Sequence, residues 1–119
     1  MNTVPGIDFE SGLELVGGDQ EILDMILVTY YEEGESTIDN IKKSFEEKDI
    51  KNYTIYTHGL KSASRSIGAN DLADHAFEHE KKGKEEDYDY IAADVDNLLS
   101  EYIILLENLK SYLESNDLM

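Results

Sequence analysis

The sequence predicts an all-α fold, built as an antiparallel helical bundle. Apolar residues recur at spacings of three and four along most of the 119-residue chain, and no segment sustains the alternation of a strand. The one proline, Pro5, lies near the start, where it interrupts nothing downstream. Short connections between the apolar stripes favour antiparallel neighbours. At this length we expect a single domain covering residues 1–119.

The first half of the chain is predicted to hold a short helix, a longer helix and a further apolar helical stripe. Asp8 can cap a short helix that stops at Gly17-Gly18, and Asp19 can cap a second, longer helix. Gly34 marks a break or a kink in that second helix. A third stripe follows it, and the segment EEKDIKN, residues 46–52, is typical of a polar turn.

The second half is predicted to hold three helices. One runs over about 51–67 and ends at Gly68, and Asn70 can cap the next, which continues to Gly83. The last helix repeats its apolar residues at spacings of four and three, as in a heptad seam: Ile91, Val95, Leu98, Tyr102, Leu105, Leu109 and Tyr112. Four further residues widen the seam into a band that should face the core: Leu99, Ile103, Leu106 and Leu113.

Composition excludes several classes of function. Ten Lys and Arg against 27 Asp and Glu give a net charge of −17, which repels phosphate backbones and anionic lipid, so we expect no nucleic-acid or membrane partner. Cysteine is absent, which removes disulfides and thiol chemistry. The start, MNTVPGIDFESG, has no signal-peptide pattern, and no apolar run reaches the roughly 20 residues of a membrane span. We expect a cytoplasmic, monomeric protein.

The helix over 51–67 has two contrasting faces. One is apolar and should pack on the core: Tyr56, Leu60, Ala63 and Ile67. The opposite face carries a histidine, two cations and a small hydroxyl: His58, Lys61, Ser62 and Arg65. Residues 59–69 contain no acidic side chain, so this face should form a positive island on an acidic protein. An exposed neutral imidazole is a nucleophile, and the two cations could hold an anion attached to it.

The run HGLKSASRSIGA resembles the signature of histidine-containing phosphotransfer domains, H-x-x-K-G followed by Gly-Ala about ten residues after the histidine. The matching residues are His58, Lys61, Gly68 and Ala69. Two flanking segments, GIDFESGLELVGGDQEILDMIL and LADHAFEHEKKGK, are also similar to this family, so the resemblance covers nearly the whole chain. It implies a four-helix bundle with one or two short accessory helices and the phosphoacceptor on an exposed face.

The resemblance also implies an activity. His58 would accept a phosphoryl group and pass it to or from the aspartate of a response-regulator receiver domain, with a hybrid sensor histidine kinase as a further partner. Lys61 would support the phosphoryl group. Domains of this family bind no ATP and have no autonomous kinase activity, so no cofactor is expected. The alternative is a non-catalytic helical interaction domain in which His58 is never phosphorylated.

Three further residues are predicted to bind the partner. The family most often has glycine where this chain has Ser62, whose small hydroxyl could donate to a phosphoryl oxygen, so we expect activity to survive. Arg65 could tune the local potential. Ile55 precedes His58 by one helical turn; it could dock a receiver domain or equally pack against a neighbouring helix.

The segment HAFEH, residues 75–79, fits the H-x-x-E-H pattern of inverted zinc peptidases. Two histidines four apart on a helix can share a metal, but no third ligand is evident at a suitable spacing. We therefore predict that His75 and His79 pack at the edge of the core and that the chain binds no metal. The family tends to have apolar residues near these positions, followed by an acidic residue that matches Glu80.

Overall fold

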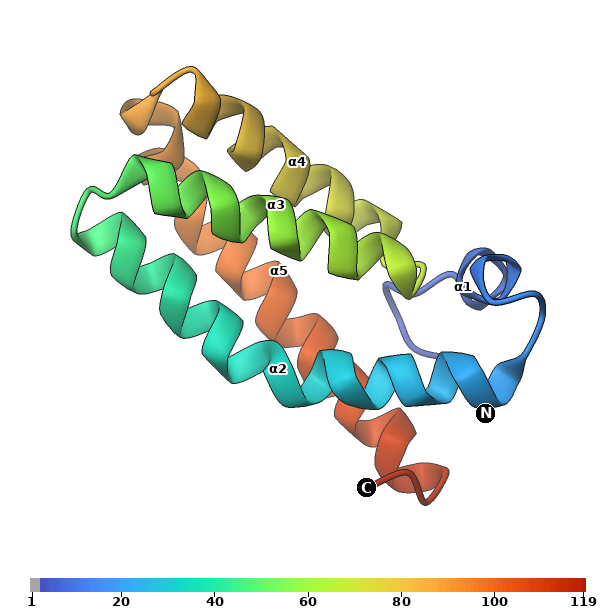
Figure 1. The fold of residues 1–119 in the computed structure, drawn as a ribbon. Helices are drawn as coiled ribbons and strands as arrows, with labels where there is room; N and C mark the ends of the chain where they lie inside the picture. The colour runs from blue at the N-terminus through green and yellow to red at the C-terminus, as the bar shows by residue number, and fades with distance from the viewer. Residues whose placement is uncertain (1–2) are drawn as a thin grey trace.

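The computed structural model describes residues 3–119, and all regular secondary structure in that range is helical (Figure 1). The prediction of an all-α fold is confirmed. Residues 1 and 2, with which the expected domain begins, lie outside the described residues. The helices, in chain order, are α1 (Phe9–Leu15), α2 (Gln20–Glu46), α3 (Ile50–Ser66), α4 (Asn70–Lys84) and α5 (Tyr88–Ser115).

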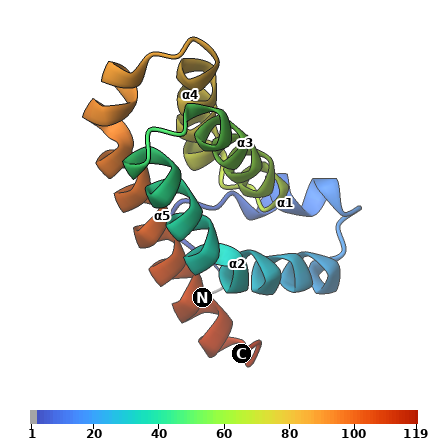
Figure 2. The same ribbon diagram turned by 60° about the vertical axis from the view of Figure 1, so that its left-hand side comes forward.

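Four long helices contact one another in a ring. α2 packs against α3, α3 against α4, α4 against α5, and α5 back against α2. Figures 1 and 2 show α3 and α4 side by side, with the short α1 at one end of the pair. α1 contacts α2 and α3. The contact between α3 and α4 is the most extensive one between any two helices of the described chain.

Aspartates begin most of the helices. The Asp8 carboxylate accepts from the Ser11 N–H at 3.2 Å, and Asp19 accepts from the second and third residues of α2, both as predicted. The expected cap at Asn70 is wrong, because Ala69 takes the cap position and is fully buried. The turn before it lies against the start of α1, where Gly68 accepts from the Asp8 N–H at 2.8 Å, and a buried position of this kind suits a small apolar side chain.

α2 is a single continuous helix, so of the two expectations for Gly34 the break is wrong; Figure 1 shows α2 bending along its length, which agrees with the alternative of a kink. Gly34 is buried, and a Cβ there would lie 2.6 Å from Cδ1 of Leu106. The glycine therefore allows a close approach of α2 to α5 rather than ending the helix.

The core lies between α5 and the other long helices. Every residue of the predicted α5 seam is buried. Ile103, expected to widen that seam, is instead 38% exposed, because the arc of α5 that its neighbours cover does not extend to this position.

The buried face of α3 is rotated from the predicted one. Tyr56 and Ala63 are only half-buried, and the stripe that is buried reads Tyr53, Thr57, Leu60, Ser64 and Ile67. Its hydroxyls are satisfied inside the core: Thr57 donates to a carbonyl one turn back at 3.0 Å, and Ser64 pairs with the Tyr30 hydroxyl at 2.9 Å. Hydrophobicity alone could not identify these positions, because small polar side chains with internal partners pack as well as apolar ones.

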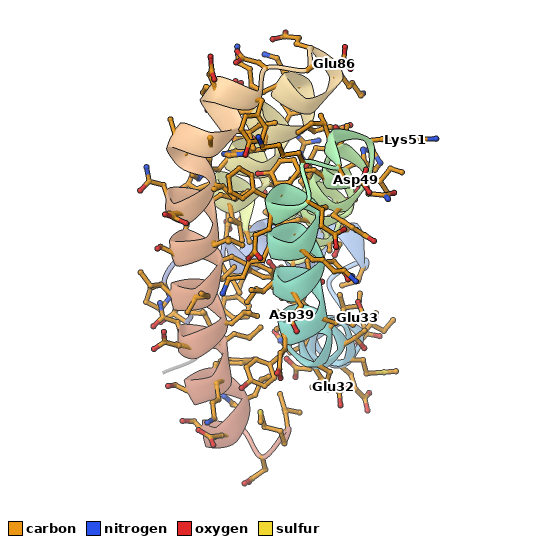
Figure 3. All side chains as sticks on the ribbon, turned by 90° about the vertical axis from the view of Figure 1, so that its left-hand side faces the viewer. Glu32, Glu33, Asp39, Asp49, Lys51 and Glu86 are labelled. Carbon is orange, nitrogen blue, oxygen red and sulfur yellow. The ribbon has the colours of Figure 1, made fainter. Side chains whose placement is uncertain are left out.

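Acidic side chains cover the outer surface. Figure 3 shows Glu32, Glu33 and Asp39 on α2, all of them exposed. Within residues 3–119 no helix combines the length and the apolarity that crossing a membrane would require.

Candidate functional site

His58 lies on the solvent side of α3, and 57% of its side chain is exposed. Its Nδ1 atom lies 2.9 Å from Oε2 of Glu80, a residue of the neighbouring helix α4. Glu80, in contrast, has only 4% of its side chain exposed. The site therefore combines an open imidazole with a carboxylate buried beneath it.

Glu80 is held as an anion by its neighbours. Lys61 of α3 places its Nζ 2.7 Å from Oε1, and Lys84 of α4 places its Nζ 3.2 Å from Oε2. Burial raises the pKa of the Glu80 carboxyl, but contacts with Lys61, His58 and Lys84 outweigh it and lower that pKa to about 2. An ionised carboxylate can only accept hydrogen bonds.

This contact orients the His58 ring chemically as well as sterically. Because Glu80 can only accept, His58 Nδ1 carries the hydrogen that it donates. In the neutral ring the lone pair then lies on Nε2, the nitrogen on the far side of the ring from Nδ1. The arrangement presents a nucleophilic nitrogen on an exposed imidazole, with a buried anion able to stabilise positive charge that develops on the ring.

Lys61 is a positioned cation, not a freely exposed one. Only 13% of its side chain is exposed, and its ammonium lies 5.1 Å from the centre of the Phe77 ring as well as against Glu80. The predicted positive island is therefore partly balanced by an anion from α4, which the sequence of α3 could not show.

The three expected partner-binding residues are all exposed. Ile55 is 55% exposed, so it does not pack against a neighbouring helix as fully as the alternative required. Ser62 faces solvent one turn beyond His58, and Arg65 is half exposed, with its guanidinium 3.9 Å from Asp74. Beside His58, Gly59 leaves open space: a Cβ built there would meet no atom within 4 Å.

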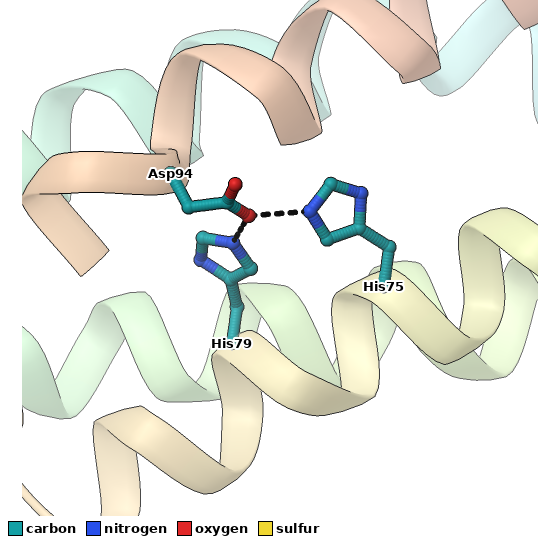
Figure 4. Close-up of side chains that lie close together, drawn as sticks. All are labelled: His75, His79 and Asp94. Atoms are coloured by element: carbon teal, nitrogen blue, oxygen red, sulfur yellow. Dashed lines mark hydrogen bonds and ion pairs between the residues drawn. The ribbon is translucent and has the colours of Figure 1, made fainter. Parts of the chain in front are cut away.

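A second histidine cluster lies between α4 and α5 (Figure 4). The Nε2 atoms of His75 and His79 lie 2.5 and 2.8 Å from the same oxygen, Oδ2 of Asp94. His75 lies at the edge of the core, as predicted, but His79 is fully buried inside it. His75 also contacts Glu101 through Nδ1 at 2.7 Å, and the Tyr53 hydroxyl lies 2.8 Å from His79 Nδ1.

Charge in this second cluster is set by burial and by the carboxylates. Burial raises the pKa of Asp94, but hydrogen bonds from His75, Asn97 and His79 outweigh it and lower that pKa to about 2. Burial lowers the pKa of His79, which favours the neutral ring. Burial also opposes the charged form of His75, yet its bonds to Asp94 and Glu101 leave the pKa of His75 raised.

Two residues of these clusters were not identified from the sequence. Glu80 was noted only as an acidic match, with no role, and Asp94 was not singled out; nor was Glu101, which contacts His75. Each lies on a different helix from the histidine it contacts, 22 residues from His58 and 15 from His79 respectively. The sequence offers one local signal for Asp94: this charged residue stands directly before Val95, a member of the apolar α5 seam.

A family model described as Hpt domain matches residues 25–117, which is more than half of the chain. The chain therefore belongs to the Hpt domain family, the histidine-containing phosphotransfer domains that its signature resembles. Membership implies a histidine phosphotransfer module of the kind that works with receiver domains and kinases in phosphorelays. No curated protein and no solved structure matches the chain significantly.

Proposed function

We propose that this protein is a phosphotransfer module of a two-component phosphorelay and that His58 is its phosphoacceptor. One observation supports this most strongly: His58 is exposed while buried Glu80 engages Nδ1, which leaves the lone pair of Nε2 for reaction. The family's antiparallel four-helix arrangement, with its acceptor on an outer face, agrees with the ring of contacts among α2, α3, α4 and α5.

The transfer step follows from this arrangement. The Nε2 lone pair attacks the phosphorus of a receiver's aspartyl phosphate in line with the leaving oxygen, a nitrogen–phosphorus bond forms, and the bond to the aspartate oxygen breaks. The aspartate leaves as a carboxylate. Positive charge that develops on the His58 ring is stabilised by Glu80 through Nδ1, and Lys61 lies one turn away to offset charge on the phosphoryl oxygens. Transfer in the opposite direction retraces these events.

The partner surface surrounds His58. Ile55 offers an apolar contact and Ser62 and Arg65 offer polar ones, while Gly59 leaves room for the incoming domain. The partner is a response-regulator receiver domain, a hybrid sensor histidine kinase or both, and it supplies the aspartate and the Mg²⁺ that accompanies it. We further propose that residues 1–119 act as one monomeric, cytoplasmic domain.

The test is label transfer from a phosphorylated receiver domain to the wild-type protein and to two variants. We expect the wild type and His75→Gln to become labelled. His58→Gln keeps size and polarity but lacks the nucleophile, so its labelling should fall at least about a hundredfold. Equal labelling of His58→Gln and the wild type would exclude His58 as the acceptor. Binding of the receiver without any transfer would favour the alternative, a non-catalytic interaction domain.

A further inference from the structure

Two imidazoles and one carboxylate converge between α4 and α5, away from the face that carries His58. His75 and His79 lie one turn apart on α4, and both direct Nε2 at Oδ2 of Asp94 on α5 (Figure 4). The three potential ligand atoms all lie within 4.8 Å of one another. The expectation that this histidine pair binds no metal rested on the lack of a third ligand, and Asp94 supplies one.

We propose that His75, His79 and Asp94 form a binding site for a divalent transition-metal cation such as Zn²⁺, which fastens α4 to α5. Two imidazole nitrogens and a carboxylate oxygen are donors that Zn²⁺ prefers, whereas Mg²⁺ and Ca²⁺ favour oxygen alone. This inference does not depend on the proposed phosphotransfer.

The spacing of the ligand atoms is close to what an ion requires. In a tetrahedral zinc site, nitrogen and oxygen ligands at about 2.0–2.1 Å from the metal stand about 3.3 Å from one another. The Nε2 atoms of His75 and His79 lie 2.5 and 2.8 Å from Asp94 Oδ2, so these two contacts would lengthen by about 0.8 and 0.5 Å. Rotation of the partly exposed His75 and Asp94 side chains can provide this movement.

Outer contacts already hold both rings in a metal-binding orientation. The other nitrogen of His75 contacts the Glu101 carboxylate at 2.7 Å, and the other nitrogen of His79 contacts the Tyr53 hydroxyl at 2.8 Å. Metal-bound histidines usually donate their second N–H to a carboxylate, a carbonyl or a comparable acceptor, which fixes the tautomer and aims the ligating nitrogen. In the structure both Nε2 atoms carry a hydrogen that they donate to the ionised Asp94 carboxylate. A metal ion bound at Nε2 would release these hydrogens to solvent, and the His79 ring would then carry its hydrogen on Nδ1, where the Tyr53 hydroxyl can accept it.

Burial and charge suit a structural ion with limited access. His79 is fully buried, while His75 and Asp94 have 22% and 25% of their side chains exposed, so an ion can enter from the solvent side. Asp94 offers one negative charge, and Glu101 stands directly behind His75 with a second. Water can complete the coordination on the exposed side.

Peptidase chemistry is not part of this proposal. In the H-x-x-E-H pattern the glutamate would be the general base, but Glu78 is nearly half exposed and lies 3.5 Å from Lys81 on the solvent side of α4. No hydrogen bond or ion pair joins Glu78 to His75, His79 or Asp94 within the described residues; its one such contact is with Lys81. The site is therefore structural.

The experiment is a calorimetric titration of the wild-type protein with Zn²⁺ in an excess of Mg²⁺, which occupies adventitious carboxylate sites on this acidic chain. We expect one equivalent of Zn²⁺ to bind with a Kd in the micromolar range or tighter. Asp94→Asn keeps the shape of the side chain but removes the anionic ligand. His75→Ala removes the less buried of the two imidazole ligands. Each substitution should weaken Zn²⁺ binding at least tenfold. Circular dichroism first establishes that both variants are folded, and two independent variants guard against the failure of either.

His58→Gln is the matched control, since it removes the one histidine outside the cluster and should leave the Kd unchanged. Replacing Zn²⁺ by Co²⁺ should give the intense visible absorption of a tetrahedral ion in the wild type and lose it in Asp94→Asn. Equal Zn²⁺ affinity in the wild type, Asp94→Asn and His75→Ala would overturn the proposal. So would displacement of Zn²⁺ by Mg²⁺, or a loss of binding in His58→Gln, which would put the ion at the phosphoacceptor face.

Discussion

Two histidine–carboxylate contacts of nearly equal length serve different ends in this molecule. His58 lies 2.9 Å from Glu80, and His79 lies 2.8 Å from Asp94. Both carboxylates are held as anions, with the pKa of each lowered to about 2. The difference lies at the second ring nitrogen: in His79 it meets the Tyr53 hydroxyl inside the core, whereas the His58 ring is 57% exposed. Under the proposed function, exposure of the second ring nitrogen, and not the carboxylate contact, would make His58 reactive while His79 stays structural.

Replacement of His79 should therefore reduce the stability of the fold, whereas replacement of His58 should abolish phosphotransfer and leave the stability unchanged. His79→Ala opens a cavity, removes one of the hydrogen-bond partners of Asp94 and leaves the Tyr53 hydroxyl without its partner, so we expect a stability loss of about 3 kcal/mol. His58→Gln should change stability by no more than about 0.5 kcal/mol. Urea unfolding with a chelator present measures both. The folded fraction of His79→Ala should still be labelled at His58, and unfolding of His58→Gln would contradict the exposed placement of that residue.

Acid should weaken the α3–α4 contact through Glu80. Its folded-state pKa of about 2 lies below the ordinary value of 4.5, so its ion pairs contribute stability above about pH 4.5 and lose it as the pH falls toward 2. Between these pH limits the unfolding free energy of the wild type should fall by on the order of 3 kcal/mol more than that of Glu80→Gln, because the glutamine takes up no proton. Urea unfolding at about pH 5 and about pH 2 measures this loss of unfolding free energy for the wild type and for Glu80→Gln. The exposed Glu86→Gln (Figure 3) is the control and should follow the wild type.

Lys61→Ala should fold but transfer more slowly, because the cation proposed to offset charge on the phosphoryl oxygens is lost. Charge-assisted contacts of this kind contribute roughly 1.5–3 kcal/mol, which corresponds to a slowing of about tenfold or more. Arg65→Ala should slow transfer less, since its guanidinium is half exposed and stands 3.9 Å from Asp74. Rapid-quench measurement of label transfer compares the two. A larger effect of Arg65→Ala would shift the supporting role from Lys61 to Arg65.

Gly59→Ala is expected to leave the fold intact. No atom lies within 4 Å of the added Cβ, and alanine is the better helix former, so stability should rise by up to about 1 kcal/mol. The methyl group stands beside His58 on the proposed partner surface, so transfer from a receiver should slow while the fold is unharmed. Thermal unfolding and label transfer on the same sample separate these effects. Unchanged transfer would show that the receiver does not approach this side of His58.

Several expectations were correct for local reasons and several failed for non-local ones. The caps at Asp8 and Asp19 and the α5 seam follow from contacts within a few residues along the chain. Gly34 was expected to mark a break or a kink, but its role against Leu106 depends on how closely α2 and α5 approach, which residues near it in the chain do not specify. The face of α3 was rotated for a similar reason, since the hydroxyls of buried Thr57 and Ser64 find partners only in the folded core.

The amino-acid sequence by itself determined the helical class, the two glycines that end α1, the exposure of His58 and the phosphotransfer signature around it. These properties depend on capping, on the helical period and on residues a few positions apart. Only the tertiary structure decided what each histidine contacts. Glu80 reaches His58 and Asp94 reaches His79 across helix interfaces, and which side chains meet there is set by the rotation and register of packed helices, which a spacing in one helix does not specify.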